Sequence, residues 1–112
     1  MGSSAQASAA LPDPALRVLL ALGSEAAHGY AIMRRIADVS GGRLQILPGT
    51  LYSTLRRMVT DGLVEECAPP RDADSDDARR RYYRVTKRGR AAAESEMERL
   101  SLLVKLGRVF QS

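Results

Sequence analysis

The sequence predicts a mainly α-helical domain with a small β-hairpin and one long C-terminal helix. Three short amphipathic segments come first, and proline or glycine bounds each of them, as is usual where helices begin and end. Two short segments with strand composition follow, separated by a polar linker, which indicates a hairpin. An apolar repeat at alternating spacings of four and three residues then runs towards the C-terminus. This order predicts a winged helix-turn-helix with a C-terminal dimerisation helix.

The composition narrows the class of protein. Apolar residues make up 45% of the 112 residues, and the net charge of +4 weakly favours nucleic acid as a partner. The single cysteine excludes an internal disulfide, and with one histidine it cannot form a zinc site within one chain. No apolar run approaches a membrane span. We expect one domain in a cytoplasmic protein, with no metal, cofactor or membrane partner.

We divide the chain into three parts. Residues 1–11 are mostly small and polar and predict a flexible tail, residues 12–86 the winged helix-turn-helix, and residues 87–112 the dimerisation helix. The first helix is expected from Asp13, as N-cap, to Gly23. Leucines lie almost all round it, so a second side is expected to face another subunit, with Leu16 and Leu20 in that interface.

A second helix is expected near His28 to Ser40, where a pair of glycines ends it. Its spacing predicts that Ile32, Met33 and Ile36 face the core. With the helix that follows it, this segment has the lengths typical of a helix-turn-helix pair, although the link between them is somewhat long.

The stretch from Leu47 to Leu63 predicts a third helix with one apolar and one polar face. Pro48 suits its first position and Gly62 its C-terminal end. Tyr52 lies at the border, with its ring able to pack and its hydroxyl free to point outward. Small hydroxylated residues followed by arginines fit a major-groove reader, although a solvated polar face fits this stretch equally well. The apolar face comprises Leu51, Leu55, Met58 and Val59, and the polar face Gly49, Thr50, Ser53, Arg56 and Arg57.

Two strands are expected at Leu63 to Ala68 and Arg80 to Thr86, joined by the linker PPRDADSDDA. Its four aspartates would repel phosphate, so the basic run Arg79 to Arg81 is the better candidate for contact with a DNA backbone. The aspartates also suggest calcium, but Asp77 stands where a calcium loop needs glycine, and Tyr83 where it needs glutamate. We therefore expect a solvated loop that shields or pairs with the arginines.

The last helix is expected from Lys87 to Phe110, with Thr86 as its N-cap. A helix of ~23 residues spans ~35 Å, which is longer than so small a domain can cover. Its apolar seam therefore needs a partner, and the same helix of a second copy is the simplest one. The seam comprises Ala93, Met97, Leu100, Val104 and Gly107, and Leu103, Leu106 and Phe110 widen it.

The order of elements and the residues together resemble the PadR family of winged-helix transcriptional regulators. The matching motifs are LLALGSEAAHGYAIMRRI (Leu19 to Ile36), PGTLYSTLRRMVTDGLVE (Pro48 to Glu65) and RRYYRVTKRGRAA (Arg80 to Ala92). The short terminal helix is similar to that of the small family members, which carry a single dimerising helix. The resemblance implies a homodimer that binds a palindromic operator in double-stranded DNA. It also implies a protein that usually acts as a repressor and releases DNA when an effector binds.

The resemblance also implies roles for single residues. It places the start of the third helix in the major groove and matches His28, Gly29 and Tyr30 to the start of the second helix. We interpret His28 as a helix cap or phosphate contact, and Tyr30 as a core residue. The residues predicted to contact DNA are His28, Gly29, Gly49, Thr50, Tyr52, Ser53, Arg56, Arg57, Arg79, Arg80, Arg81 and Lys87. Those predicted in the dimer interface are Leu16, Leu20, Met97, Leu100, Val104 and Gly107.

Two alternatives remain open besides a DNA-binding regulator. One is a winged-helix module that binds protein, and the other is a thiol-based redox sensor of the same fold that uses Cys67, although a small apolar strand residue explains this cysteine more simply. An enzyme is not predicted, because the sequence contains no nucleophile–base pair, glycine-rich phosphate loop or metal cluster. The sequence does not identify the operator, the effector or the sign of regulation.

Overall fold

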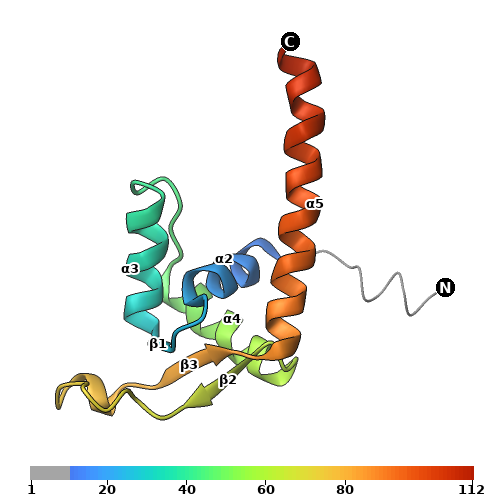
Figure 1. Ribbon diagram of the computed structural model, residues 1–112. Helices are drawn as coiled ribbons and strands as arrows, with labels where there is room; N and C mark the ends of the chain where they lie inside the picture. The colour runs from blue at the N-terminus through green and yellow to red at the C-terminus, as the bar shows by residue number, and fades with distance from the viewer. Residues whose placement is uncertain (1–10) are drawn as a thin grey trace.

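The computed structural model describes residues 11–112, and all but the last residue of the predicted flexible tail lie outside this range. The predicted fold class is confirmed (Figure 1). Three short helices and a small antiparallel sheet form one packed unit, which we call the head (residues 13–85), and one long helix extends from it. The elements are α2 (Asp13–Leu22), β1 (Ala27–His28), α3 (Gly29–Val39), α4 (Pro48–Thr60), β2 (Val64–Cys67), the 3₁₀ turn η1 (Asp77–Arg79), β3 (Tyr82–Val85) and α5 (Lys87–Gln111).

The sheet has three strands, in the order β1-β3-β2, where the sequence predicted two. The predicted hairpin is present, with Val64 opposite Val85 and Cys67 opposite Tyr82. The additional strand, β1, has only two residues and pairs with the far edge of β3, with His28 opposite Tyr82. A strand this short has no alternating pattern, so it could not be predicted from the sequence. The start of α3 is therefore joined by strand pairing to the hairpin of β2 and β3, which we call the wing (residues 64–85).

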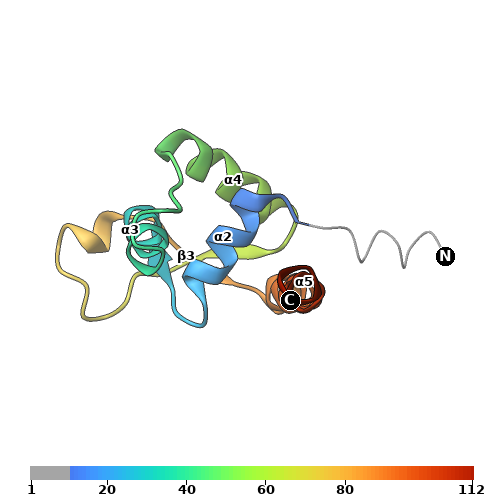
Figure 2. The ribbon, with the colours of Figure 1, turned by 90° about the horizontal axis from the view of Figure 1, so that it is seen from above.

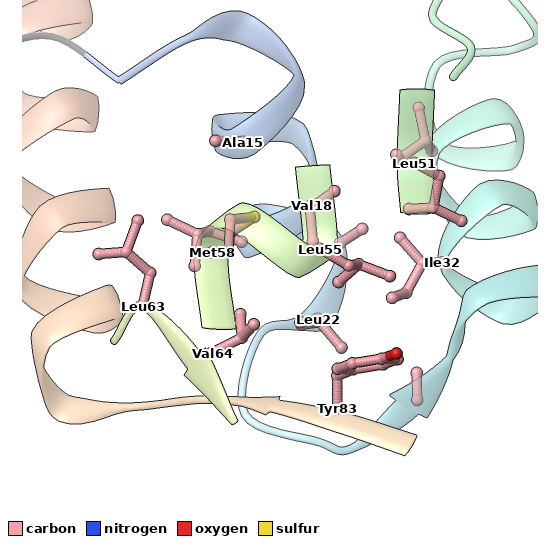
Figure 3. Packing of buried hydrophobic residues seen from close by; sticks show 14 of the residues in the cluster. Ala15, Val18, Leu22, Ile32, Leu51, Leu55, Met58, Leu63, Val64 and Tyr83 are labelled. Carbon is pink, nitrogen blue, oxygen red and sulfur yellow. The ribbon is translucent and has the colours of Figure 1, made fainter. Parts of the chain in front are cut away.

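The core lies between the three short helices and the sheet (Figure 3). Helix α2 crosses the middle of the head and contacts α3, α4 and α5 (Figure 2). Its Val18 and Leu22 are fully buried, as are Ile32 of α3 and Leu51 of α4. Aliphatic side chains fill most of this space, which agrees with the low aromatic content of 4%. The core therefore fixes the angle of α4 against α2 and α3.

Helix α2 begins one residue earlier than predicted. The N-cap is Pro12, whose carbonyl oxygen accepts the first helical hydrogen bond from Leu16 N at 3.1 Å. Asp13 is therefore the first helical residue and does not cap the helix. Its carboxylate instead pairs with Arg17, with 2.8 Å between Oδ2 and Nη2. The charge still lies in the first turn, where the helix dipole favours it.

The predicted ends of the other helices follow from local chemistry. The side chain of Thr86 accepts a hydrogen bond from Gly89 N at 3.0 Å, and so caps α5 as predicted. At the end of α4, Gly62 adopts φ +75°, and Leu63 N donates to Met58 O at 2.9 Å, which closes a Schellman motif. Val59, predicted on the apolar face of α4, is instead 43% exposed, because it lies at the edge of that face.

Helix α5 has two unlike halves. In the first, which we call the near half (residues 87–96), Gly89, Ala93 and Glu96 are buried against the head. In the second, the far half (residues 97–111), most side chains are exposed, and the helix extends away from the head (Figure 1). Gly89 is where the near half meets the head most closely, because a Cβ there would lie 2.0 Å from Leu63 O.

Candidate nucleic-acid interface

The first turn of α4 exposes the small residues that the sequence predicted to face DNA. Pro48 occupies the first helical position, and Gly49, Thr50 and Ser53 are exposed. Leu47, the N-cap residue, makes no side-chain hydrogen bond to the turn. The free amide groups and the positive end of the helix dipole therefore face outward, as an anion-binding helix start requires.

Tyr52 packs against the start of α3. A Cβ placed on Gly29 would lie 2.6 Å from Tyr52 Oη, so only glycine at this position lets the phenol ring lie so close. The hydroxyl was predicted to point outward, but it lies against this backbone because Gly29 leaves room for it. The side chain remains 42% exposed, so one side of the ring is still open to a ligand.

A cavity of about 300 Å³ joins α3, α4 and β3. Gly29 and His28 contribute the positive end of α3, and three arginines add positive charge around it. Six of the twelve residues predicted to contact DNA therefore meet in one concave site, although they come from three separate motifs. We call this cavity the basic pocket. It is lined by His28, Gly29, Tyr52, Arg56, Arg80, Arg81 and Tyr83.

Other predicted DNA contacts lie outside the basic pocket. Arg57 lines a separate hollow of about 420 Å³ on another side of α4, with Pro12 and Thr54. Lys87 lies in the first turn of α5 and is exposed. Arg79 is exposed at the end of η1. These three residues would reach DNA only if it extends beyond the pocket.

Carboxylates partly neutralise the arginines of the wing. Asp77 Oδ1 lies 3.3 Å from Arg80 Nε, and Glu66 Oε1 lies 3.7 Å from Arg81 Nε. Within β3, Arg84 Nε donates to Glu65 Oε1 at 2.7 Å. The prediction that the loop pairs with neighbouring arginines is therefore right for Asp77. Among these pocket and wing arginines, Arg56 has no ion-pair partner within residues 11–112.

His28 is the helix cap that the sequence predicted. Its Nδ1 accepts a hydrogen bond from Ala31 N at 3.1 Å, which requires the neutral ring. Burial lowers the pKa of His28, and the charge of Arg80 lowers it further, while Asp77 acts in the opposite direction. The ring also meets Tyr82 edge to face, with the ring centroids 5.3 Å apart. His28 therefore holds α3 and the sheet together.

Sequence reasoning missed Tyr30. It was expected in the core, but it is 49% exposed and lies between two guanidinium groups, those of Arg34 at 5.8 Å and Arg80 at 5.7 Å from its ring centroid. Position 30 falls outside the buried face of α3, which Ile32 and Ile36 define. The helical spacing of Ile32 and Ile36 could therefore have indicated that Tyr30 is exposed.

A family model described as "Transcriptional regulator PadR-like family" matches residues 18–95, which is more than half of the chain. The chain belongs to the PadR-like family. The match includes α3, α4, the hairpin and the near half of α5, and ends just before the far half.

The chain is also similar to individual proteins and solved structures. The chain is 37% identical over 100 residues to an uncharacterised 37.1 kDa protein of transposon TN4556 from Streptomyces fradiae; the match covers 89% of this chain but only 26% of that protein. A PadR family transcriptional regulator from Eggerthella lenta is 30% identical, with a TM-score of 0.63 over 88% of this chain and 81% of its own. A transcriptional regulator from Clostridium thermocellum has the same fold, with a TM-score of 0.72 at 24% identity over 88% and 90% of the two chains.

The residues predicted in the dimer interface of this PadR-like chain differ in exposure. Leu20 of α2 and Met97, Leu100 and Val104 of α5 are exposed, and Gly107 is half-buried. Leu16 is only 8% exposed within its own chain, so it offers little surface to a partner. Its side of α2 is used by the core of the same chain, which a helix with leucines all round does not reveal in advance.

Within residues 11–112 of this PadR-like protein, no three histidine, cysteine or acidic side chains converge as a metal site. No helix in that range is long and apolar enough to cross a membrane. Cys67 is half-buried on β2, where burial raises the pKa of its thiol. A raised pKa makes a thiol less reactive near neutral pH, which argues against the redox alternative.

Proposed function

We propose that this PadR-like protein is a homodimeric repressor that binds palindromic operator DNA through α4 and releases it when an effector binds. The single observation that carries the proposal is the basic pocket, which brings residues of three separate motifs together beside the exposed first turn of α4. Each further step rests on a different part of the head.

Sequence recognition is assigned to α4. Its exposed turn carries Thr50 and Ser53, whose hydroxyl groups suit base edges or phosphate, and Gly49 lets the backbone approach closely. Arg56 lies one turn further on and lines the basic pocket, and no carboxylate in the described part of the chain pairs with it. Such a side chain is available to a phosphate or to a guanine edge.

Backbone contact is assigned to the basic pocket. The first turn of α3 and the arginines of the wing surround it, and both kinds of group favour phosphate. Asp77 of the wing loop lies beside Arg80 at the edge of this pocket, and the charge of the other loop aspartates disfavours DNA at the loop tip. Recognition would therefore rest on α4, with the base of the wing as support.

Dimerisation is assigned to the far half of α5, together with Leu20 of α2. A second copy that covers the exposed apolar side chains would place two α4 helices on one DNA face. Two-fold symmetry of the protein then requires two-fold symmetry of the site, with half-sites about one helical turn apart. An effector would act by changing the angle between the two heads, because only differential affinity for the DNA-competent state shifts the equilibrium.

Fluorescence anisotropy with DNA from upstream of the protein's own gene tests the proposal. We expect binding at low salt that weakens steeply as salt rises. Arg56→Ala should lower the affinity roughly tenfold or more. Arg108→Ala removes the same charge from the far half of α5, outside the proposed contact, and is the matched control. Absence of binding at low salt, or equal loss in both variants, would contradict the proposal.

Repression and release need their own measurement. A reporter gene behind the operator should be less active when the protein is present and recover when an effector is added. A thermal-shift screen with and without operator DNA identifies effectors, since a compound that stabilises the free dimer should weaken DNA binding. Higher reporter activity in the presence of the protein would make it an activator instead.

A further inference from the structure

We infer that Asp77 and Tyr30 are positioning residues that hold the Arg80 guanidinium at the edge of the basic pocket, ready for a DNA phosphate. This inference rests on the proposed function and deepens it, because it assigns a role to the acidic wing loop. Neither residue was among the predicted DNA contacts. Asp77 was expected to shield or pair with arginines, and Tyr30 was expected in the core.

Arg80 is held from two sides. On one side, Asp77 Oδ1 lies 3.3 Å from its Nε. On the other, its guanidinium carbon lies 5.7 Å from the centroid of the exposed Tyr30 ring, which is within the range of a cation–π contact. The shortest distance to the carboxylate involves Nε, and no hydrogen bond within residues 11–112 engages the two terminal nitrogens. These nitrogens are the pair that a phosphate accepts from in a bidentate contact.

The two holding residues are themselves fixed. Asp77 begins the η1 turn, and its backbone N donates to Asp74 Oδ1 at 2.8 Å. Its carboxylate also faces His28 Nε2 at 3.7 Å, and so joins the wing loop to the cap of α3. Tyr30 lies in the first turn of α3, where its ring stacks on His28 with centroids 6.4 Å apart. The arginine is therefore positioned by groups that belong to the wing and to α3 at once.

A rival reading is that Asp77 is a competing anion that occupies the phosphate site. Both readings place a carboxylate beside Arg80, but they predict opposite signs for its removal. Freeing a competing site raises DNA affinity, whereas freeing a positioned arginine lowers it, because a long side chain must then be ordered during binding. The contact through Nε and the aromatic contact on the other side favour positioning. Neither blocks the terminal nitrogens.

The test compares Asp77→Ala with Asp72→Ala in operator binding. Asp72 lies in the same loop, is exposed and makes no ion pair within residues 11–112, so its removal changes the charge equally without disturbing Arg80. We expect Asp77→Ala to weaken binding roughly fivefold, since ordering one long side chain costs about that factor. Asp72→Ala should leave binding unchanged or strengthen it. If Asp77→Ala strengthens binding as much as Asp72→Ala does, the inference is wrong.

Two further variants separate positioning from general damage. In an Arg80→Ala background, Asp77→Ala should have no effect on affinity beyond that of Asp72→Ala, and Arg80→Ala should reduce the salt dependence by about one phosphate contact. Tyr30→Phe keeps the ring and should bind like the unmodified protein, whereas Tyr30→Leu should bind like Asp77→Ala. Additive losses from Asp77 and Arg80, or equal losses from both Tyr30 variants, would contradict the inference.

A measurement without DNA distinguishes failure of this inference from failure of the proposed function. The heteronuclear NOE of Arg80 Nε should be high in the free protein and fall in Asp77→Ala and Tyr30→Leu, but not in Asp72→Ala. An equally mobile Nε in the unmodified protein and in Asp77→Ala would refute the positioning role, whether or not the operator binds. A protein with an ordered Nε that binds no operator would refute the proposed function, and with it the role of Arg80 in DNA contact.

Discussion

The two halves of α5 belong to one continuous helix, yet they differ in almost every physical respect. The near half is packed on the head, where Gly89 lies against the backbone of Leu63 and Ala93 joins the core. The far half is rich in leucine and valine but leaves them exposed, and Phe110 at its end is 92% exposed. Apolar composition alone therefore does not indicate whether a helix surface is buried within its own chain. Within residues 11–112, the near half is packed against the head, whereas the far half leaves most of its apolar side chains exposed.

The largest loss of stability is expected at Gly89, where the near half leaves no space for a side chain. Gly89→Ala places a methyl group 2.0 Å from a carbonyl oxygen that cannot move without the strand, so it should lower the free energy of unfolding by more than about 4 kcal/mol. Denaturant unfolding followed by circular dichroism measures the change. Gly49→Ala is the control, because no atom lies within 4 Å of its added methyl group. Equal stability of both variants would contradict close packing of the near half.

The next effect concerns the far half. Leu100→Glu with Val104→Glu puts two charges into the proposed seam and should raise the dimer dissociation constant about 100-fold or more, because it removes two exposed apolar side chains that the proposed dimer would bury. Sedimentation at several concentrations measures the constant. Lys105→Glu changes the net charge by the same amount (−2) on the other side of the helix and is the control. A dimer that survives the double substitution would show that its seam lies elsewhere.

The boundary between the halves is marked by Glu96, a carboxylate that is only 5% exposed and pairs with Arg99. Arg99→Met should cost about 1–3 kcal/mol of stability, because it leaves a buried charge without its partner. Arg108→Met makes the same change near the end of the helix, where no ion pair within residues 11–112 is lost, and should be neutral. The pair of unfolding curves tests this, and a neutral Arg99→Met would place the boundary further towards the head.

Acidification should produce the smallest loss of stability, and this loss should be confined to the head. The pKa of His28 is below its ordinary value of 6.5, so the folded head binds fewer protons than the unfolded chain. The contribution of His28 to stability is therefore complete above about pH 6.5 and is lost as the pH falls through the folded pKa. His28→Asn can still cap α3 and should remove this part of the pH dependence.

The far half provides the contrast in the same experiment. It contains no histidine, so its dimer dissociation constant should stay flat between pH 7.5 and 5.5 while the stability of the head declines. The two quantities are measured by sedimentation and by denaturant unfolding at each pH. Greater stability of the head at the lower pH would contradict the role of the neutral His28 ring.

Local chemistry explains why the sequence predicted several helix ends correctly. Pro48, Gly62 and Thr86 mark helix ends because their conformational and capping preferences act over a few residues. The basic pocket could be anticipated only as separate motifs, since its parts meet through tertiary packing. Strand β1 was missed because its two residues become a strand only beside β3. Tyr30 was misplaced because its contact with Arg80 joins α3 to the wing.

In the proposed dimer, the length of α5 would have a mechanical consequence. A continuous helix of 25 residues without proline is a stiff rod, fixed to the head at Gly89. A rod ~37 Å long that tilts by roughly 10° displaces its end by about 6 Å, which is a sizeable fraction of the ~34 Å repeat of DNA. A change of less than one side-chain width at the crossing point of two such rods could thus carry two reading heads out of register with their site. In the proposed dimer, the far half of α5 would therefore act as a lever as well as an interface.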